Sequence, residues 1–308
     1  MESQSVTFDQ LVKVGCGIDV HKDLIVATIR KDNQTFETRE FASYTSSLTV
    51  LRDWCKTEQV THIAMESTGI YWKPVFNILG DDFEVILVNA RHVKNVPGHK
   101  TDKKDSRWLS KLLLAGLLKG SFIPAQDIRE LRDLVRYKRK VVDQGASEKN
   151  RIIKILEDAN VKLSSVLTNV DGATGTKVIN DLIAGKTDAD ELFLHYHGKI
   201  KASKEEFRKA LEGRLTAHHQ FMLKLIQQSI RDKEALIDAL ETQIDHAVKD
   251  YQVEVDLLQT IPGVGRDSAI GIISEMGTDM DRFPNEKHIS SWAGVSPGNN
   301  ESGGKKKP

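Results

Sequence analysis

Four acidic residues have the types and positions that a divalent-metal site needs. Asp19 ends an apolar segment near the start of the chain, and Glu66 ends a later one. Asp102 and Asp105 are three residues apart, which places them on one face of a helix start. Carboxylates brought together repel one another unless cations neutralise them, and Mg²⁺ binds through carboxylates, waters and substrate phosphates. A pair of such ions can clamp both oxygens of a phosphoryl displacement.

Each acidic residue also has a structural interpretation. If Asp102 and Asp105 stood alone, an N-cap and an acidic first turn that faces the positive end of the helix dipole would be the better explanation of the pair. Asp19 would fit a turn between strands. Glu66 is harder to explain in structural terms, because it ends an apolar strand immediately before Ser67-Thr68-Gly69.

The elements that must position these residues form a mixed α/β pattern. Alternation of apolar and polar residues predicts three antiparallel strands separated by short polar turns, and alternating helices and strands follow. Together they predict a mixed sheet with covering helices. The expected strands are 14–20, 24–30, 35–41, 62–66 and 84–89, and the expected helices are 47–58 and 71–80.

Three helical regions are expected further along the chain. Residues 101–120 read as a helix with Gly120 as its C-cap, and 127–159 as a long basic helix. Residues 205–250 show sustained heptad-like spacing, which favours a long hairpin arm or coiled coil and hence self-association. A long helix that packs on its own domain would show the same pattern.

A glycine-rich turn joins two short helical patterns in residues 257–276. Its Pro262-Gly263-Val264-Gly265 sequence is typical of a helix-hairpin-helix, in which glycines allow close approach to a phosphate. Arg266 follows directly. The alternative is a glycine-rich turn between two packed helices.

The charge distribution favours a polyanionic partner, although the whole chain is neutral, with 44 basic and 44 acidic residues. Residues 91–154 hold 17 Lys plus Arg and seven Asp plus Glu, a net charge of +10, which leaves −10 on the rest. A basic block of this kind is expected of a surface that contacts nucleic-acid phosphates, although a solvated helix face gives the same count. The candidate contact residues are Lys100, Lys103, Lys104, Arg107, Arg136, Lys138, Arg139, Lys140, Gly263, Gly265 and Arg266.

Length and composition exclude several other classes. A chain of 308 residues with 39% hydrophobic residues can form one large or two medium domains, and its longest apolar run is too short to span a membrane. The first ten residues lack the order of a secretory signal, so we expect a cytoplasmic protein. Cys16 and Cys55 are the only cysteines, which excludes a disulfide framework or a cysteine metal site.

Three motifs together resemble the DEDD transposases of bacterial insertion sequences, the bridge-RNA-guided recombinases whose relatives include pilin-gene invertases. They are Gly-Ile-Asp-Val-His-Lys at 17–22, Met-Glu-Ser-Thr-Gly at 65–69, and Asn-Ala-Arg at 89–91 leading to Lys-Thr-Asp-Lys-Lys-Asp-Ser at 100–106. The order and spacing of the motifs agree with the family over nearly the whole chain, including the Ile-Pro-Gly-Val-Gly turn.

The resemblance implies a RuvC-like, RNase H-type fold that holds Mg²⁺ or Mn²⁺ on Asp19, Glu66, Asp102 and Asp105. It also implies a serine nucleophile in a Ser-Gly context after Trp-Ala-Gly-x-x-Pro, which places the role on Ser302, with Ser296 as the weaker candidate. A serine hydroxyl attacks a phosphodiester only if its proton is removed and the phosphate charge is shielded. From the sequence alone, without the resemblance, an ordinary flexible Gly-Ser tail is the better explanation of Ser302.

The resemblance further implies DNA and a structured guide RNA as partners, a homodimer or homotetramer, no membrane association, and a nucleoid-associated location in the bacterial cytoplasm. The expected domains are a catalytic domain at 1–160, a helical linker and coiled-coil arm at 161–250, and a C-terminal domain with the helix-hairpin-helix at 251–308. Family members usually continue for tens of residues beyond the Ser-Gly. We therefore expect a truncated C-terminal domain, with an intact metal site and impaired recombination.

Two other functions fit the same residues. A metal-dependent, structure-selective nuclease akin to Holliday-junction resolvases would use the four carboxylates to activate water, without a serine. A non-catalytic copy would bind nucleic acid with a steep salt dependence and cleave nothing. Covalent protein–DNA attachment through serine separates the recombinase from both.

Overall fold

The chain forms two compact units, residues 1–123 and 124–308. The computed structural model describes residues 10–32, 34–67, 69–89, 105–296, 301–302 and 305–306, the last two pairs by their backbone alone. Within these ranges, no helix has both the length and the apolar character that a membrane span requires. The functional boundaries expected at residues 160 and 250 stay predictions.

Five strands among the described residues form one mixed sheet in the order β3-β2-β1-β4-β5. The central strand β1 is antiparallel to β2 and parallel to β4, and β4 is parallel to β5. This confirms the predicted mixed sheet, and the arrangement is consistent with an RNase H-like domain. The strands are β1 (Gly15–Val20), β2 (Leu24–Arg30), β3 (Phe36–Ala42), β4 (His62–Glu66) and β5 (Glu84–Val88).

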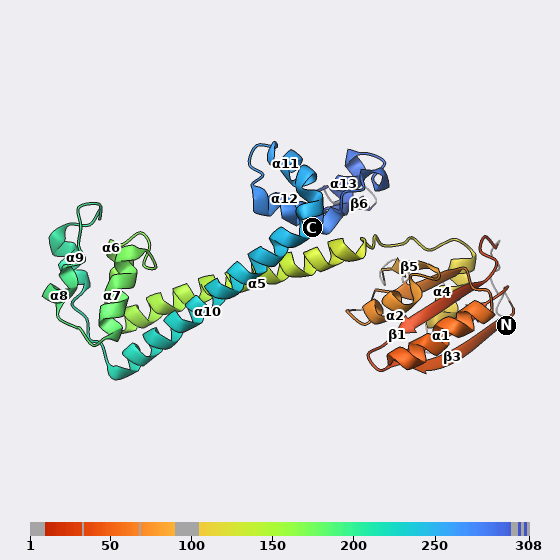
Figure 1. Ribbon diagram of the computed structural model, residues 1–308, viewed down its shortest axis with the longest axis horizontal. Coiled ribbons are helices and arrows are strands. Elements are labelled where there is room, and N and C mark those ends of the chain that lie inside the picture. The colour runs from red at the N-terminus through yellow and green to blue at the C-terminus, as the bar shows by residue number, and fades with distance from the viewer. Residues whose placement is uncertain are drawn as a thin grey trace. The chain divides into compact units, whose positions relative to one another are not determined.

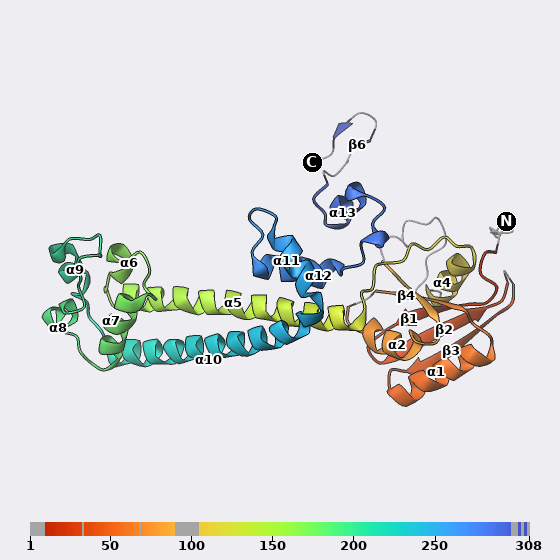
Figure 2. The same ribbon diagram turned by 45° about the horizontal axis from the view of Figure 1, so that its top comes forward.

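Helices α1 (Thr45–Thr57) and α2 (Trp72–Leu79) cover one face of this sheet (Figure 2). Side chains alternate along a strand, so every second residue of β1 enters this layer. Cys16, Ile18 and Val20 are fully buried there against the apolar side of α1. The two helices and the sheet therefore share one apolar core.

Helix α4 (Asp105–Leu114) lies against the other face of the sheet, directly over two glycines of β1. A Cβ atom added at Gly17 would stand 2.2 Å from the backbone oxygen of Ser106, and one at Gly15 would stand 2.8 Å from the Leu113 side chain. The start of α4 thus lies near the end of β1, and the helix runs antiparallel to the strand. The Ser106 hydroxyl also lies 2.8 Å from that of Thr28 on β2.

The prediction that this helix extends to Gly120 was wrong. The chain leaves the helix at Gly116, which has a φ of +66°. The amide of Leu117 donates to the carbonyl of Leu112 across 3.0 Å, as expected for a glycine C-cap. Gly120 instead pairs with Val88 in an isolated bridge beside β5.

The second unit is built on two long helices, α5 (Gln126–Asp158) and α10 (Ala217–Ala247), which run antiparallel side by side (Figure 1). His219 at the start of α10 lies 2.8 Å from Asp158 at the end of α5. At the opposite end, Ile128 of α5 shares a core with Ile244 of α10. Helix α10, which forms most of the region 205–250, therefore packs on its own chain as one arm of a hairpin, and self-association through this region stays a prediction.

The apolar spacing of residues 205–250 does not form one helix. Helix α9 (Lys204–Ala210) ends before a short loop, and α10 begins at Ala217. The loop is fixed by the amide of Arg214, which donates to the Ala159 carbonyl across 2.7 Å, and by Gly213, where a Cβ would stand 2.3 Å from Val161.

A group of short helices covers the ends of α5 and α10 that lie near Asp158 and Ala217 (Figure 1). Phe207 is fully buried at the centre of their shared core. We call this group the tip. Its helices are α6 (Leu163–Val166), α7 (Ala173–Ile183), α8 (Ala189–Phe193) and α9.

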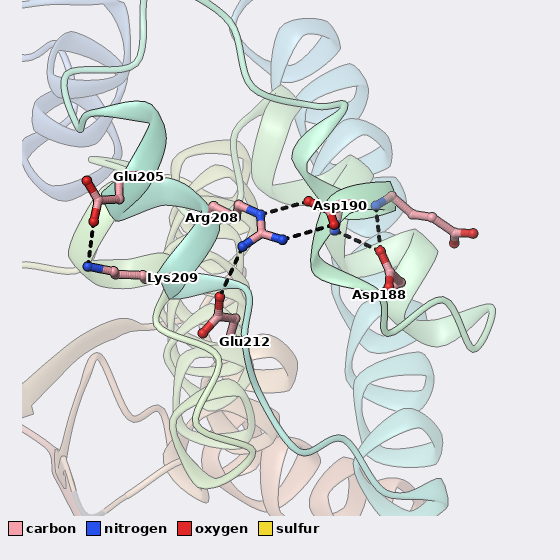
Figure 3. A network of polar contacts seen from close by, with 7 residues as sticks. Asp188, Asp190, Glu205, Arg208, Lys209 and Glu212 are labelled. Carbon is pink, nitrogen blue, oxygen red and sulfur yellow. Dashed lines mark hydrogen bonds and ion pairs between the residues drawn. The ribbon is translucent and has the colours of Figure 1, made fainter.

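One ion pair joins α8 and α9 on the surface of the tip, and another lies within α9 (Figure 3). The Arg208 guanidinium donates two hydrogen bonds to Asp190, at 2.7 and 2.9 Å. Lys209 lies 2.7 Å from Glu205, and Asp188 caps the start of α8. The hydrogen bond from Arg208 lowers the pKa of Asp190, and the one from Lys209 lowers the pKa of Glu205.

The remaining short elements pack on the opposite end of the hairpin or follow it in the chain. Arg132 of α5 donates to the carbonyls of Ser274 and Glu275, which ties the last turn of α12 to the hairpin. These short elements are the 3₁₀ helix Lys249–Tyr251, α11 (Gln252–Gln259), α12 (Arg266–Met276), the 3₁₀ helix Met280–Arg282, α13 (Glu286–Trp292), and the strands β6 (Glu301–Ser302) and β7 (Lys305–Lys306).

We predict opposite effects of alanine at two glycines. Gly17→Ala should lower the free energy of unfolding by about 3 kcal/mol, because its methyl group would force α4 off β1. Gly145→Ala in the middle of α5 should raise it by about 0.5 kcal/mol, because nothing lies within 4 Å of the added methyl. Urea denaturation followed by circular dichroism measures both. A neutral Gly17→Ala would contradict the close packing of α4 on β1.

We also predict that the tip loses stability in acid. Its paired carboxylates have pKa values below the ordinary ones, so their contribution is complete only above about pH 5 and disappears as pH falls through the lowered values. The thermal midpoint at low salt should therefore fall between pH 5 and pH 3, roughly. Arg208→Ala should reduce this dependence, and an unchanged pH profile in that variant would refute the assignment.

Candidate acidic site and nucleic-acid interface

Asp19 and Glu66 lie side by side at the carboxyl ends of neighbouring parallel strands. Ile18 of β1 is in register with Met65 of β4, so the next residue on each strand is acidic. Residues in register on parallel strands project from the same face, and Asp19 shares the face of Gly17, which α4 covers. The two carboxylates therefore leave the sheet on the α4 side.

The third acidic residue, Asp105, is at the N-terminal end of the described part of α4. Its neighbour Ser106 lies directly over Gly17, two residues before Asp19 on β1. The antiparallel course of α4 thus brings Asp105 to the same edge of the sheet as Asp19 and Glu66. The predicted Asp102 lies outside the described residues.

The surroundings of these carboxylates differ. The Asp19 side chain is 16% exposed and lies 3.0 Å from Nε2 of His21, whereas Glu66 is half-buried and Asp105 is exposed. Sequence reasoning missed His21 as a partner, although its spacing of two from Asp19 is that of same-side neighbours on extended backbone. Among the described residues, no three His, Cys, Asp or Glu side chains are grouped closely enough to hold a metal ion.

The donor chemistry of this edge fits a hard divalent cation. Carboxylate oxygens are the ligands that Mg²⁺ and Mn²⁺ prefer, and soft ligands are kept away from it. The thiol of Cys16 is buried in the layer of α1, on the other face of β1, and its pKa is raised by burial.

The two serine candidates lie in the second unit. Ser302 belongs to β6, where its backbone pairs with Lys305 of β7. Ser296 is exposed, and its amide donates to the carbonyl of Ser290 across 3.2 Å. Neither observation assigns a nucleophile, so the role of Ser302 stays a prediction.

Several of the predicted phosphate contacts are cations that already have acidic partners. Arg136 makes a bidentate ion pair with Glu275 of α12, at 2.8 and 2.9 Å, and hydrogen bonding to Glu275 raises the pKa of Arg136. Burial lowers the Lys138 pKa, but hydrogen bonds to Glu241 and Asp267 outweigh it and raise the value overall. These cations therefore help to hold the helices together.

The remaining candidates differ in what they contact. Arg107 donates to the Thr38 hydroxyl across 3.2 Å and stacks over Phe36, and Arg266 lies 2.5 Å from Asp245. By contrast, Arg139 and Lys140 are exposed on α5. Lys100, Lys103 and Lys104 lie outside the described residues.

The glycine-rich turn between α11 and α12 leaves its backbone accessible. Gly263 has a φ of +88°, which favours glycine, and a Cβ at Gly263 or Gly265 would have no neighbour within 4 Å. Beside it, a cavity of about 370 Å³ lies between α5, α10 and α12, with Arg139 and Arg266 among its lining residues. An approaching chain could thus reach the turn without steric conflict, although the helix-hairpin-helix stays a prediction.

Comparison with known families accounts for both ends of the chain. Residues 16–161 match the family described as DEDD_Tnp_IS110, Transposase, and residues 255–308 match the family described as Transposase IS116/IS110/IS902 family. The chain belongs to the DEDD transposases of insertion sequences. A search of curated proteins found no match.

Membership gives the transposase its general chemistry. Transposases bind DNA and cut and rejoin it, and DEDD transposases generally use divalent metal ions. The first match contains the strand ends that carry Asp19 and Glu66 and the helix that carries Asp105. The acidic edge of the sheet is therefore the candidate catalytic site of this transposase.

Proposed function

We propose that this transposase cuts and rejoins DNA during insertion-sequence transposition, with Ser302 as nucleophile and Mg²⁺ or Mn²⁺ at the acidic edge. One observation carries the proposal: the contact of α4 with Gly17 brings Asp105 to the edge where Asp19 and Glu66 end parallel strands. Asp102 would complete the four carboxylates that give the family its name.

The residues would divide the chemistry between them. The bound ions would supply charge shielding for the phosphate. The Ser302 hydroxyl forms a bond to phosphorus while the ester bond to the departing DNA oxygen breaks. Its proton passes to a carboxylate of the acidic edge, and the departing oxygen takes up a proton. In the rejoining step, that hydroxyl gives up its proton and attacks the phosphorus of a second serine–DNA linkage. The bond from phosphorus to the serine oxygen breaks, and the serine hydroxyl regains a proton.

Partners follow from the same proposal. Contacts from Lys and Arg to phosphate carry no sequence information, so base pairing with a structured guide RNA would select the DNA site. A homodimer or homotetramer would let the acidic edge of one protomer act with the serine of another. Region 205–250 would build that assembly.

A metal-dependent nuclease is the second candidate. Its supporting observation is that Asp19, Glu66 and Asp105 all belong to the first unit, which would suffice for hydrolysis by activated water. This candidate needs no residue of the second unit for chemistry.

We predict that Ser302→Ala and Glu66→Gln each reduce covalent protein–DNA adducts by about 100-fold or more in Mg²⁺ or Mn²⁺. The assay would use matched donor DNA with its guide RNA, denaturing gels for adducts, and parallel measurement of cleavage. Glu84→Gln is the matched control. This exposed carboxylate begins β5, at the sheet edge opposite the one where Glu66 ends β4. It should leave adduct formation unchanged.

The variants also separate the alternatives. Ser296→Ala would abolish the adduct in place of Ser302→Ala if the weaker serine candidate were the nucleophile. Cleavage that Glu66→Gln abolishes and both serine variants retain would establish the nuclease. Intact binding without cleavage would establish a non-catalytic copy.

A further inference from the structure

The middle of α5 carries a strong excess of basic residues. The described stretch 136–154 holds seven Lys and Arg and only two acidic residues, Asp143 and Glu148. Three of the basic side chains have close acidic partners on other helices or loops. Arg136 pairs with Glu275, Lys138 with Glu241 and Asp267, and Lys149 with Asp171 at 2.5 Å.

The other four basic residues are exposed, and we call them the α5 stripe. They are Arg139, Lys140, Arg151 and Lys154. In the part of the chain that the structure describes, Arg151 has a single ion-pair contact, 3.7 Å from Glu148, and the other three have none within 4.0 Å. Their charge is therefore available to a partner from outside the chain.

The helix geometry places these four side chains along one side of α5. Arg139 and Lys154 are 15 positions apart, about 22 Å along a straight α-helix. The residues between the two pairs on this side are mostly uncharged and polar: Gln144, Ser147 and Asn150 are exposed, with Asp143 as the acidic member. This pattern gives two groups of positive charge joined by hydrogen-bonding side chains.

The neighbouring helix of the hairpin has the opposite charge. Residues 232–245 of α10 contain five acidic residues and one lysine, Lys233. Lys233 is itself only 20% exposed and faces Glu148 of α5. A polyanion would therefore be attracted to the α5 side and repelled from this part of α10.

We propose that the α5 stripe binds the phosphate backbone of a double-stranded nucleic acid. Charge complementarity identifies phosphate as the ligand. The side chains favour the double-stranded form, because single-strand sites combine cations with several stacking aromatics. The basic stretch 136–154 has one aromatic, the exposed Tyr137, and it lies outside the segment 139–154 that carries the stripe. The inference rests on the proposed nucleic-acid function and adds the surface and the form of the ligand.

The test measures binding of the full chain to 30-base-pair DNA, to RNA of the same length, and to single-stranded DNA, without divalent ions. Fluorescence anisotropy at several salt concentrations gives the affinity and its salt dependence. The variant is Arg139→Ala/Lys140→Ala/Arg151→Ala/Lys154→Ala. A control variant removes four exposed cations elsewhere: Lys177→Ala/Lys199→Ala/Lys224→Ala/Arg231→Ala.

The stripe variant should weaken duplex binding about eightfold per lost phosphate contact at 0.1 M salt and flatten the salt slope by about 0.9 per contact. The control variant should keep the wild-type slope, and thermal melting should show both variants folded. Duplex binding with unchanged slope in the stripe variant would overturn the proposal, as would a loss confined to single strands. The DNA and RNA arms show which duplex is bound.

This outcome is independent of the catalytic proposal, since no cleavage occurs without divalent ions. Lys138→Ala adds a second control on the same helix. The Lys138 ammonium is held by Glu241 and Asp267. Its removal should therefore lower the free energy of unfolding and leave the salt dependence of duplex binding unchanged. An equal flattening by Lys138→Ala alone would contradict the assignment of the stripe.

Discussion

The contact between α4 and β1 is the constraint on which the candidate catalytic site depends. Gly17 lets the backbone of α4 lie directly on the central strand, with the Ser106 oxygen where a side chain would otherwise stand. Without that contact, Asp105 would have no fixed relation to the strand ends. The same contact orients α4 antiparallel to β1, so that its acidic start and the acidic ends of β1 and β4 share one edge. The close packing of the α4 backbone on the β1 backbone thus determines that the three carboxylates lie at the same edge of the sheet.

In the second unit, ion pairing determines which charges serve structure and which remain for a ligand. Acidic residues of α10 and α12 form ion pairs with Lys138 and Arg136 at one end of α5, and Asp171 forms an ion pair with Lys149 near the other end. Only some of the basic residues of this segment are left exposed without such an ion pair, whereas the composition counts all of them. The local net charge of the sequence therefore overstates the charge of the surface.

Much of the first unit could be predicted from the sequence. Apolar and polar residues alternate along a half-buried strand, and apolar residues recur every three to four positions along a helix that covers a sheet. The end of α4 could not, since Gly116 and Gly120 are both plausible caps and only packing selects between them. Leu211 and Leu215 continue the apolar spacing of their neighbours, yet they belong to a loop that tertiary contacts hold. The candidate site was predictable as strand-end carboxylates. The acidic partners of Arg136 and Lys138 on α5 were not, because they are more than 100 positions away in the chain.

The most direct test of this account maps a bound ion without DNA. Fe²⁺ in place of Mg²⁺, with ascorbate and peroxide, generates hydroxyl radicals that cut the backbone beside the metal. We expect cuts near Asp19, Glu66 and Asp105, suppressed by excess Mg²⁺ and lost in Gly17→Ala. Cuts at only one of these segments, or at none, would contradict the claim that the contact of α4 with β1 assembles a metal-binding acidic edge.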